Sequence, residues 1–418
     1  MYPLTLLFLI FLLIGTVVRV WLARRQIQSV RSCQKEVPGA FAASISLDDH
    51  HKAADYTAVR TRLGIVDSLI DPILLLLWTF GGGLNLVNGV WQDLGAGPLV
   101  TGIAVILSTL LIMSLLDLPL SIFRTFVIEQ RFGFNRTTPA LFVIDLVKGL
   151  IVFLLIGTPI VALVLWLMNV AGNYWWVAAW IAWSAFTFLI TWAYPTLIAP
   201  LFNKFEPLAD DSLRSRIESL LDRCGFRSNG IFVMDGSRRS SHGNAYFTGL
   251  GNQKRIVFFD TLVESLEPPE VEAVLAHELG HFKLKHVLKR LLLNLGLSLV
   301  GFGLLGWLML QEWFFLALGV NSVSNHMALL LFLLVIPIFT FLLTPAGAYF
   351  SRRHEFQVDE YATRQTDGDA LTTALVKLYP DNATTLTPDY IYSGFYDSHP
   401  PALVRIEHIA RRAGTGAA

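Results

Sequence analysis

Residues 268–285 of this chain read PPEVEAVLAHELGHFKLK, and the interpretation of the whole sequence starts from this stretch. The two prolines favour the start of a helix, because proline fits the first helical turn. His277 and His281 are four residues apart, so a helix places both imidazoles on one face, where they can bind one metal ion. Glu278 between them can contact a metal-bound water. Because zinc lowers the pKa of such a water toward about 7, Glu278 is predicted to be the general base of a hydrolase.

A catalytic zinc site needs a third protein ligand and an open fourth position. A histidine six residues after His281 is absent, since that position is Val287. The alternative is a glutamate on a separate helix, for which Glu355 is the candidate. Asp359 lies one helical turn further, where it can hold a ligand imidazole in one tautomer. Glu360 lies about 140° from Glu355 around a helix and is predicted to be solvated.

The rest of the chain has the composition of a membrane protein. Of its 418 residues, 54% are hydrophobic and only 15% are charged, against about 25% in soluble domains. A net charge of zero excludes nucleic-acid binding through bulk positive charge. Two cysteines, Cys33 and Cys224, exclude a disulfide scaffold and are expected to be free thiols.

Lys and Arg are absent from residues 63–123, 149–203 and 291–351, and each gap accommodates two spans of about 20 residues with a turn. Basic clusters follow the odd-numbered spans, which predicts an N-terminus outside, a C-terminus inside and cytoplasmic long polar segments. The N-terminal apolar run lacks a basic segment before it, so we expect an uncleaved anchor. Seven spans are predicted, at residues 3–22, 66–88, 98–120, 145–168, 175–198, 289–310 and 327–349.

Two polar segments between and after these spans are long enough to fold outside the bilayer. Residues 203–288 are expected to form a helix at 211–224, strands at 230–234, 244–249 and 255–260, and the helix that carries the two histidines. Residues 350–418 are expected to form a helix from about Arg353, a loop at 379–398 and a short helix after Pro401. The fold class is therefore an all-α membrane protein with a small α+β cytoplasmic metalloprotease insertion of gluzincin type. The expected organisation is residues 1–202 (five spans, with cytoplasmic loops at 23–65 and 121–144), 203–288 (metalloprotease segment), 289–349 (two spans) and 350–418 (C-terminal segment with the third ligand).

Four sequence elements occur together in the order of a known family. They are Asn244-Ala245-Tyr246-Phe247, the H-E-x-x-H motif, the helix with Glu355 and Asp359, and His399-Pro400-Pro401 followed by Arg405. With seven spans, and with Arg131-Phe132-Gly133-Phe134-Asn135 before the fourth, the chain resembles the integral-membrane zinc CAAX prenyl endopeptidases. The form of the ligand helix is similar to that of bacterial members, and the resemblance covers nearly the whole chain.

The resemblance implies seven helices enclosing a water-filled chamber, with the active site on its cytoplasmic side. It implies one Zn²⁺ per chain, held by His277, His281 and Glu355, with Glu278 catalytic. The substrate, a peptide or protein, would lie as an added strand along Asn244, Ala245, Tyr246 and Phe247. His399 would stabilise the oxyanion, Asp359 would support a ligand, and Arg405 would anchor the Glu355 helix. The residues leave open whether the substrate is lipidated or membrane-associated, and the expected location is a bacterial inner membrane.

Other functions remain as alternatives. A quality-control protease similar to HtpX uses the same chemistry with fewer spans, whereas a site-2 protease would bury the motif in an apolar span. A transporter with a structural metal would leave Glu278 without a role. Its support is the intramembrane Asp67, Asp71 and Asp117, which also indicate a wet interior because buried charges in lipid are costly. His286 is expected near the membrane interface, and His50, His326 and His408 are expected to be solvated.

Overall fold

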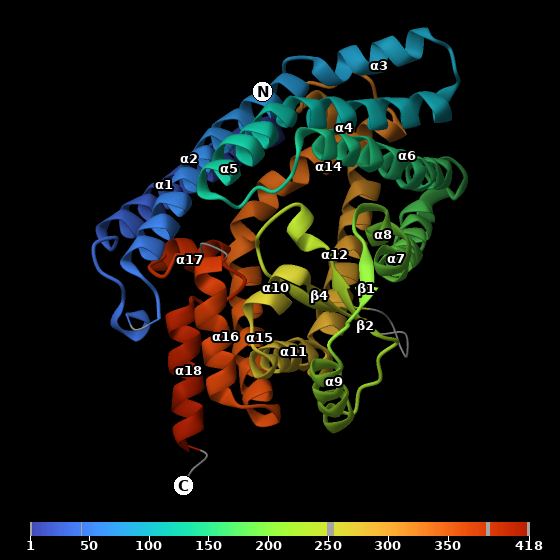
Figure 1. Ribbon diagram of the computed structural model, residues 1–418. Helices are drawn as coiled ribbons and strands as arrows, with labels where there is room; N and C mark the ends of the chain where they lie inside the picture. The colour runs from blue at the N-terminus through green and yellow to red at the C-terminus, as the bar shows by residue number, and fades with distance from the viewer. Residues whose placement is uncertain (1, 43, 249–254, 382–384, 416–418) are drawn as a thin grey trace.

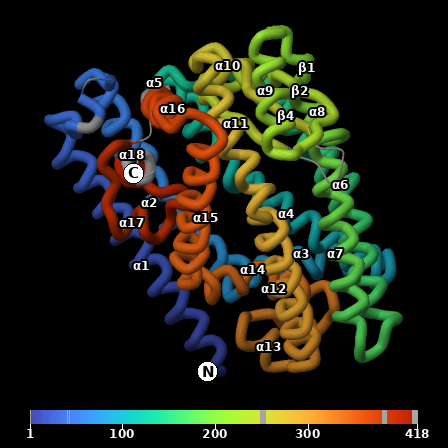
Figure 2. Tube along the Cα trace, turned by 90° about the horizontal axis from the view of Figure 1, so that it is seen from below, coloured from blue at the N-terminus to red at the C-terminus, as the bar shows by residue number. Residues whose placement is uncertain are grey.

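The computed structural model describes residues 2–42, 44–248, 255–381 and 385–415. Long apolar helices form most of it, and a small sheet with a group of shorter helices lies at the end of the molecule opposite the N-terminus and α13 (Figure 2). The helices of the apolar part are α1 (Pro3–Ser32), α2 (Leu47–Trp78), α3 (Gly83–Asp93), α4 (Pro98–Phe123), α5 (Gln130–Phe132), α6 (Pro139–Val170), α7 (Trp175–Ala193), α8 (Ala199–Phe202), α12 (His286–Leu308), α13 (Glu312–Leu316) and α14 (Asn325–Thr340).

Of the described residues, six continuous helical segments are long and apolar enough to cross a membrane, and a bent pair, α2 with α3, raises the number to as many as seven. This agrees with the seven predicted spans. The second one is broken, because α2 and α3 meet at 46°. The break falls on the glycines 81–83, where Gly82 has a φ of 80° that only glycine adopts readily.

The apolar helices α1, α12 and α7 run lengthwise through the molecule (Figure 2), and several apolar helices bury little of their surface in the protein. Only 11% of the most apolar part of α6 and 6% of that of α12 is buried inside the protein. A cavity of about 360 Å³ between α1, α2, α4 and α14 is lined mostly by apolar side chains. Its charged residues are Arg19, Asp71 and Asp117, so two of the three intramembrane aspartates border an internal space. Asp67 has a basic partner, because Nη2 of Arg124, directly after α4, lies 3.1 Å from its Oδ2.

The segments predicted as cytoplasmic loops at 23–65 and 121–144 are largely helical, because helices extend well beyond the apolar spans. α1 continues to Ser32, and α2 begins at Leu47, where the side chain of Ser46 accepts a hydrogen bond from the backbone of Asp49. α4 continues through a π-helical turn into α5. These extensions pack on each other: Tyr56 of α2 lies 5.2 Å from the ring of Phe132.

The strands that the structure describes form one sheet in the order β1-β2-β4-β3. β2 and β4 are parallel and the other pairs are antiparallel, with Tyr246 opposite Val257 and Val233 opposite Phe258. The three predicted strands are confirmed, and β1 was not predicted. Consequently β3, which contains the family-like motif, lies at one edge of the sheet. The strands are β1 (Phe205–Pro207), β2 (Ile231–Met234), β3 (Ala245–Thr248) and β4 (Arg255–Phe259).

The polar segments on either side of the last two spans share one hydrophobic core. It includes Ile217, Phe258 and Leu275 from the first segment and Ala362 and Leu371 from the second. As Figure 1 shows, α9 and the strands lie on one side of α11, and α15 and α16 lie on the other. The helices of these segments are α9 (Asp211–Cys224), α10 (Asp260–Ser265), α11 (Pro268–Lys283), α15 (Thr344–Gln365), α16 (Gly368–Asp381), α17 (Tyr390–Tyr396) and α18 (Ala402–Thr415).

The C-terminal segment contains more helix than expected. The helix expected from about Arg353 begins at Thr344, directly after the last span, because the apolar and polar parts form one nearly continuous helical segment. The expected loop at 379–398 contains the end of α16 and all of α17, while residues 382–384 lie outside the described part of the chain. The short helix after Pro401 is confirmed as α18.

Candidate metal centre and active site

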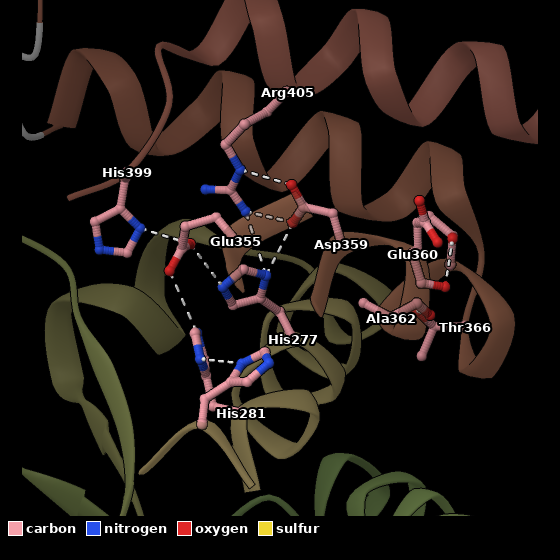
Figure 3. Close-up of polar contacts among 11 residues, drawn as sticks. His277, His281, Glu355, Asp359, Glu360, Ala362, Thr366, His399 and Arg405 are labelled. Carbon is pink, nitrogen blue, oxygen red and sulfur yellow. Dashed lines mark hydrogen bonds and ion pairs between the residues drawn. The ribbon is translucent and has the colours of Figure 1, made fainter. Parts of the chain in front are cut away.

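The two histidines of the motif lie on one face of α11, as their spacing predicts. The helix begins with Pro268 and a capping box in which Glu267 and Glu270 bind each other's backbone. Imidazole Nε2 atoms of His277 and His281 lie 3.4 and 3.5 Å from the carboxylate oxygens of Glu355 on α15. The potential ligand atoms of these three residues all lie within 4.8 Å of one another (Figure 3).

Gly280 explains how α15 comes close enough to supply the carboxylate. A Cβ atom at this position would lie 3.0 Å from Cβ of Val358 and 3.1 Å from the ring of Tyr361. Both contacts are tighter than ordinary van der Waals packing, so a larger residue would push α15 away from α11. The glycine of the motif therefore sets the distance between the two helices that carry the cluster.

The second nitrogen of His277 is held by a buried carboxylate. Nδ1 of His277 donates to Oδ1 of Asp359 at 2.9 Å, so the proton that His277 loses when it becomes neutral is the one on Nε2, the nitrogen that faces Glu355. Burial opposes protonation of the imidazole, but hydrogen bonds to Asp359 and Glu355 outweigh it and raise the pKa of His277 to about 9. In the metal-free protein the imidazole of His277 therefore stays protonated at neutral pH.

Arg405 completes this arrangement from α18. Its Nη2 and Nε atoms donate to the two oxygens of Asp359 at 2.6 and 2.9 Å, a bidentate contact between almost completely buried groups. The sequence-based expectation that Arg405 anchors the Glu355 helix thus has a structural counterpart. Arg405 binds Asp359, which lies one helical turn from Glu355 on α15.

His281 and Glu278 have different electrostatic surroundings from His277. Burial, together with the charge of His277, lowers the pKa of His281 to about 4, so its imidazole is neutral at physiological pH. Burial raises the pKa of Glu278, which makes its carboxylate a better proton acceptor. Within the described part of the chain no side chain donates a hydrogen bond to Glu278, so this carboxylate is available to a substrate or a water.

His399 lies on the open side of the cluster. Its Nδ1 atom is 2.7 Å from Oε2 of Glu355, while 62% of its side chain is exposed. A cavity of about 630 Å³ borders His399 and extends to Tyr56 and Arg60 of α2 and to Tyr392 of α17. The described structure thus brings together six of the residues singled out from the sequence (Figure 3): His277, His281, Glu355, Asp359, His399 and Arg405.

The motif Asn244-Ala245-Tyr246-Phe247 provides the start of the edge strand β3, which packs against α11. Side chains alternate along it: Ala245 and Phe247 are buried, and the ring of Phe247 lies 4.6 Å from that of Phe282 on α11. Tyr246 lies on the other face and is half-buried. Since β4 pairs with only one side of β3, the other edge of β3 has no strand partner among the described residues.

Several histidines lie elsewhere than expected. His286, at the start of α12, is buried and contacts His281 and Gln357, and its predicted position near the membrane interface stays a prediction. His50 and His326 are buried rather than solvated. Glu360 is half-buried and its Oε1 lies 3.3 Å from Nε2 of His408, so it is not fully solvated as predicted. Figure 3 shows Glu360 apart from the cluster around Glu355, as its position on the helix implies.

Two imidazoles and one carboxylate with convergent nitrogen and oxygen atoms are a donor set suited to zinc. The Nδ1 atom of His277 contacts Asp359 and that of His281 contacts His286, and metal-bound histidines in proteins commonly make such contacts through their second nitrogen. The residues present therefore fit a bound divalent metal.

Comparison with protein families gives two matches that together extend over almost all of the chain. Residues 26–204 match the family described as "CAAX prenyl protease N-terminal, five membrane helices". Residues 207–413 match peptidase family M48. The boundary between the two matches falls near the start of β1, where the membrane helices give way to the sheet.

Individual proteins resemble the chain over nearly their full length. "CAAX prenyl protease 1 homolog" of Arabidopsis thaliana is 31% identical over 409 residues, which cover 96% of both chains. "CAAX prenyl protease 1" of Saccharomyces cerevisiae is 33% identical and covers 92% of this chain and 90% of its own. The crystal structure of S. mikatae Ste24p superimposes with a TM-score of 0.91 at 29% identity, covering 98% of this chain and 99% of that one.

Proposed function

Because the chain belongs to the CAAX prenyl protease family within peptidase family M48, and is an integral-membrane metalloendopeptidase, we propose that His277, His281 and Glu355 hold one Zn²⁺ and that Glu278 is its general base. The observation that carries this proposal is the convergence of the three ligand atoms within 4.8 Å next to Glu278, whose carboxylate accepts no side-chain hydrogen bond from the described residues. Among the described residues this is the one such group of potential metal ligands, which favours a single ion per chain.

When bound by these residues, the ion would supply Lewis-acid activation of a water molecule and of the scissile carbonyl. Glu278 then accepts a proton from the attacking water and delivers it to the amine that leaves. Its raised pKa suits both steps, because a more basic carboxylate takes the proton more readily and a carboxyl group with a pKa nearer neutrality can still return it. The hydrolysis consumes one water for each peptide bond cleaved.

The surrounding polar residues have distinct proposed roles. Asp359 keeps the proton of His277 on Nδ1, so that Nε2 is free to bind the ion. Arg405 neutralises Asp359 and ties α18 to α15. His399 is exposed on the open side and is proposed to donate a hydrogen bond to the oxyanion that develops on the substrate carbonyl.

We propose that the substrate binds as an additional strand on the open edge of β3, formed by Ala245, Tyr246 and Phe247 next to Asn244. Main-chain hydrogen bonds of this kind hold a peptide irrespective of its sequence. The cavity next to His399 offers room for the part of the peptide on the other side of the scissile bond. The relatives are named as CAAX prenyl proteases, which supports a membrane-associated and lipidated substrate for this chain as well.

The proposed location is a bacterial inner membrane, with the N-terminus outside and the metal centre in the cytoplasm. Arg24, Arg25 and Arg31 lie at the end of α1 far from the N-terminus, and Arg60 and Arg62 lie in the part of α2 that packs beside it. Basic residues of this kind favour the cytoplasmic side. The match to the family over almost the whole chain favours the CAAX type over the shorter quality-control proteases.

Metal analysis of the purified protein tests the proposal. We expect about one zinc per chain and hydrolysis of a membrane-associated peptide that stops on chelation and resumes on addition of zinc. A protein that cleaves the peptide equally well after complete removal of metal would contradict the assignment of the site.

A further inference from the structure

A second chain of hydrogen bonds lies on the far side of His281, and nothing in the sequence motifs pointed to it. Nδ1 of His281 lies 3.4 Å from Nδ1 of His286. Nε2 of His286 lies 3.0 Å from Oε1 of Gln357 on α15. His286 is 4% exposed, and its ring stacks on that of His354 with the centroids 3.9 Å apart.

The Gln357 oxygen at one end of this series of hydrogen bonds determines which nitrogen of each histidine carries the hydrogen. Oε1 of Gln357 is a carbonyl oxygen and only accepts, so Nε2 of His286 carries the hydrogen. A neutral imidazole has one N–H, so Nδ1 of His286 has a lone pair and accepts from Nδ1–H of His281. Nε2 of His281 is then the lone-pair nitrogen, and it is this atom that lies 3.5 Å from Glu355 Oε1.

The backbone is bent to allow this contact. His286 is five residues after His281, and on an uninterrupted helix the two would be about 140° apart. α11 ends at Lys283, and Lys285 has a φ of 59°, the one positive φ of a non-glycine residue in the described part of the chain. Such a conformation is strained for lysine. The reversal starts α12 at His286 and brings the imidazole back against His281.

From this geometry we propose that His286, oriented by Gln357, is a positioning residue that fixes the tautomer and ring orientation of His281. The two proposed histidine ligands then have different supports, a charged carboxylate for His277 and a neutral imidazole for His281. The inference rests on the metal site proposed above. It adds residues that touch neither the ion nor the substrate but set the nitrogen offered to the ion.

Metal affinity of the full-length protein in detergent, measured by chelator competition with Zn²⁺ and with Co²⁺, tests the proposal. His286→Leu removes the acceptor and is expected to weaken binding about 10- to 100-fold. His286→Asn keeps an oxygen three bonds from Cα, as Nδ1 is, and should retain affinity within about threefold of the wild type. The visible absorption band of bound Co²⁺ should change in His286→Leu and stay close to wild type in His286→Asn.

Two further variants keep the test decisive if His286→Leu fails to fold. Gln357→Met removes the terminal acceptor at an exposed position and should weaken metal binding without loss of thermal stability. His354→Phe is the matched control, because it preserves an aromatic ring stacked on His286. His354 takes no part in the series of hydrogen bonds from His281 through His286 to Gln357. The metal affinity of this variant should equal that of the wild type.

The possible outcomes separate this inference from the metal site itself. Wild-type affinity in both His286→Leu and Gln357→Met, or an equal loss in His286→Asn and His286→Leu, would overturn the positioning role. Glu355→Ala in the same series serves as the reference. A loss of affinity in Glu355→Ala alone would reject the role of His286 and preserve the site, whereas no loss in any variant would reject the site.

Discussion

Oδ1 of Asp359, a completely buried carboxylate, lies 2.9 Å from Nδ1 of His277 and binds Arg405 at the same time. Arg405→Leu would leave this carboxylate without its permanent counter-charge. We expect a loss of about 3–5 kcal/mol in the free energy of unfolding and a metal affinity about 10- to 100-fold lower. Thermal unfolding in detergent and chelator competition measure the two effects.

Arg364→Gln is the control for the Arg405 variant. Arg364 is 75% exposed and lies 3.9 Å from Glu360 at the surface, so its loss should change stability by no more than about 0.5 kcal/mol. Equal effects of the two substitutions would contradict a special role for the buried pair.

Removal of the carboxylate from α15 is expected to abolish tight metal binding. Glu355→Ala leaves two imidazoles on α11, which is too few protein ligands for a catalytic zinc site. Metal retained after dialysis, measured by mass spectrometry, should fall to below roughly a tenth of the wild-type value. Glu360→Ala removes a carboxylate from the same helix outside the cluster and should retain the wild-type content. Unchanged metal in Glu355→Ala would require another third ligand.

Metal binding should depend on pH through His277. Its pKa of about 9 means that the ion must displace a proton at neutral pH, whereas His281, with a pKa of about 4, is already neutral. Zinc affinity should therefore rise about tenfold per pH unit from pH 6 to 8 and level off near 9. Affinity that stays constant over this range would contradict the assignment of the proton.

The stability of the metal-free protein should change in the opposite direction. The pKa of His277 is raised in the folded state above its ordinary value of 6.5, so its contribution to stability is fully present below pH 6.5 and lost as the pH rises toward 9. Unfolding temperatures of the chelated protein, recorded across this range, should decline. Asp359→Asn removes the charge that holds the proton and should flatten the decline.

The two native cysteines allow a direct test of orientation. Cys33 is exposed after α1, and Cys224 is buried. A membrane-impermeant maleimide added to intact cells should leave Cys33 unlabelled until the cells are permeabilised. Ala96→Cys in a Cys33→Ser background places a thiol in the exposed turn between α3 and α4, at the opposite membrane face, and should react without permeabilisation. The reverse pattern would invert the proposed topology.

The features predicted correctly from the sequence are those that depend on residues close together along the chain. The shared helical face of His277 and His281 follows from their four-residue spacing, and the membrane spans follow from long apolar runs without Lys or Arg. The edge position of β3 depends on the order of strands in the sheet, which no local pattern encodes. The helices in the predicted loop at 23–65 were missed although Ser46 followed by Asp48 and Asp49 is a recognisable helix start.

The role of His286 lay beyond pattern reading for a different reason. Its contact with His281 depends on a single backbone reversal at Lys285, a residue type that gives no warning of a positive φ. The spacing of five residues alone argues against a contact, because it points the two rings in different directions on a straight helix. Local strain of this kind becomes visible only when the whole chain is folded.

The central claim is that Glu278 acts on a water at a metal held by other residues. Glu278→Gln preserves the size of the side chain and removes its ability to accept a proton, while Glu264→Gln makes the same change at an exposed position outside the cluster. Metal content and turnover of a membrane-associated peptide, measured on the same preparations, test the claim most directly. We predict wild-type zinc with a turnover at least about 100-fold lower for Glu278→Gln, and no change for Glu264→Gln. Wild-type turnover by Glu278→Gln would contradict the account.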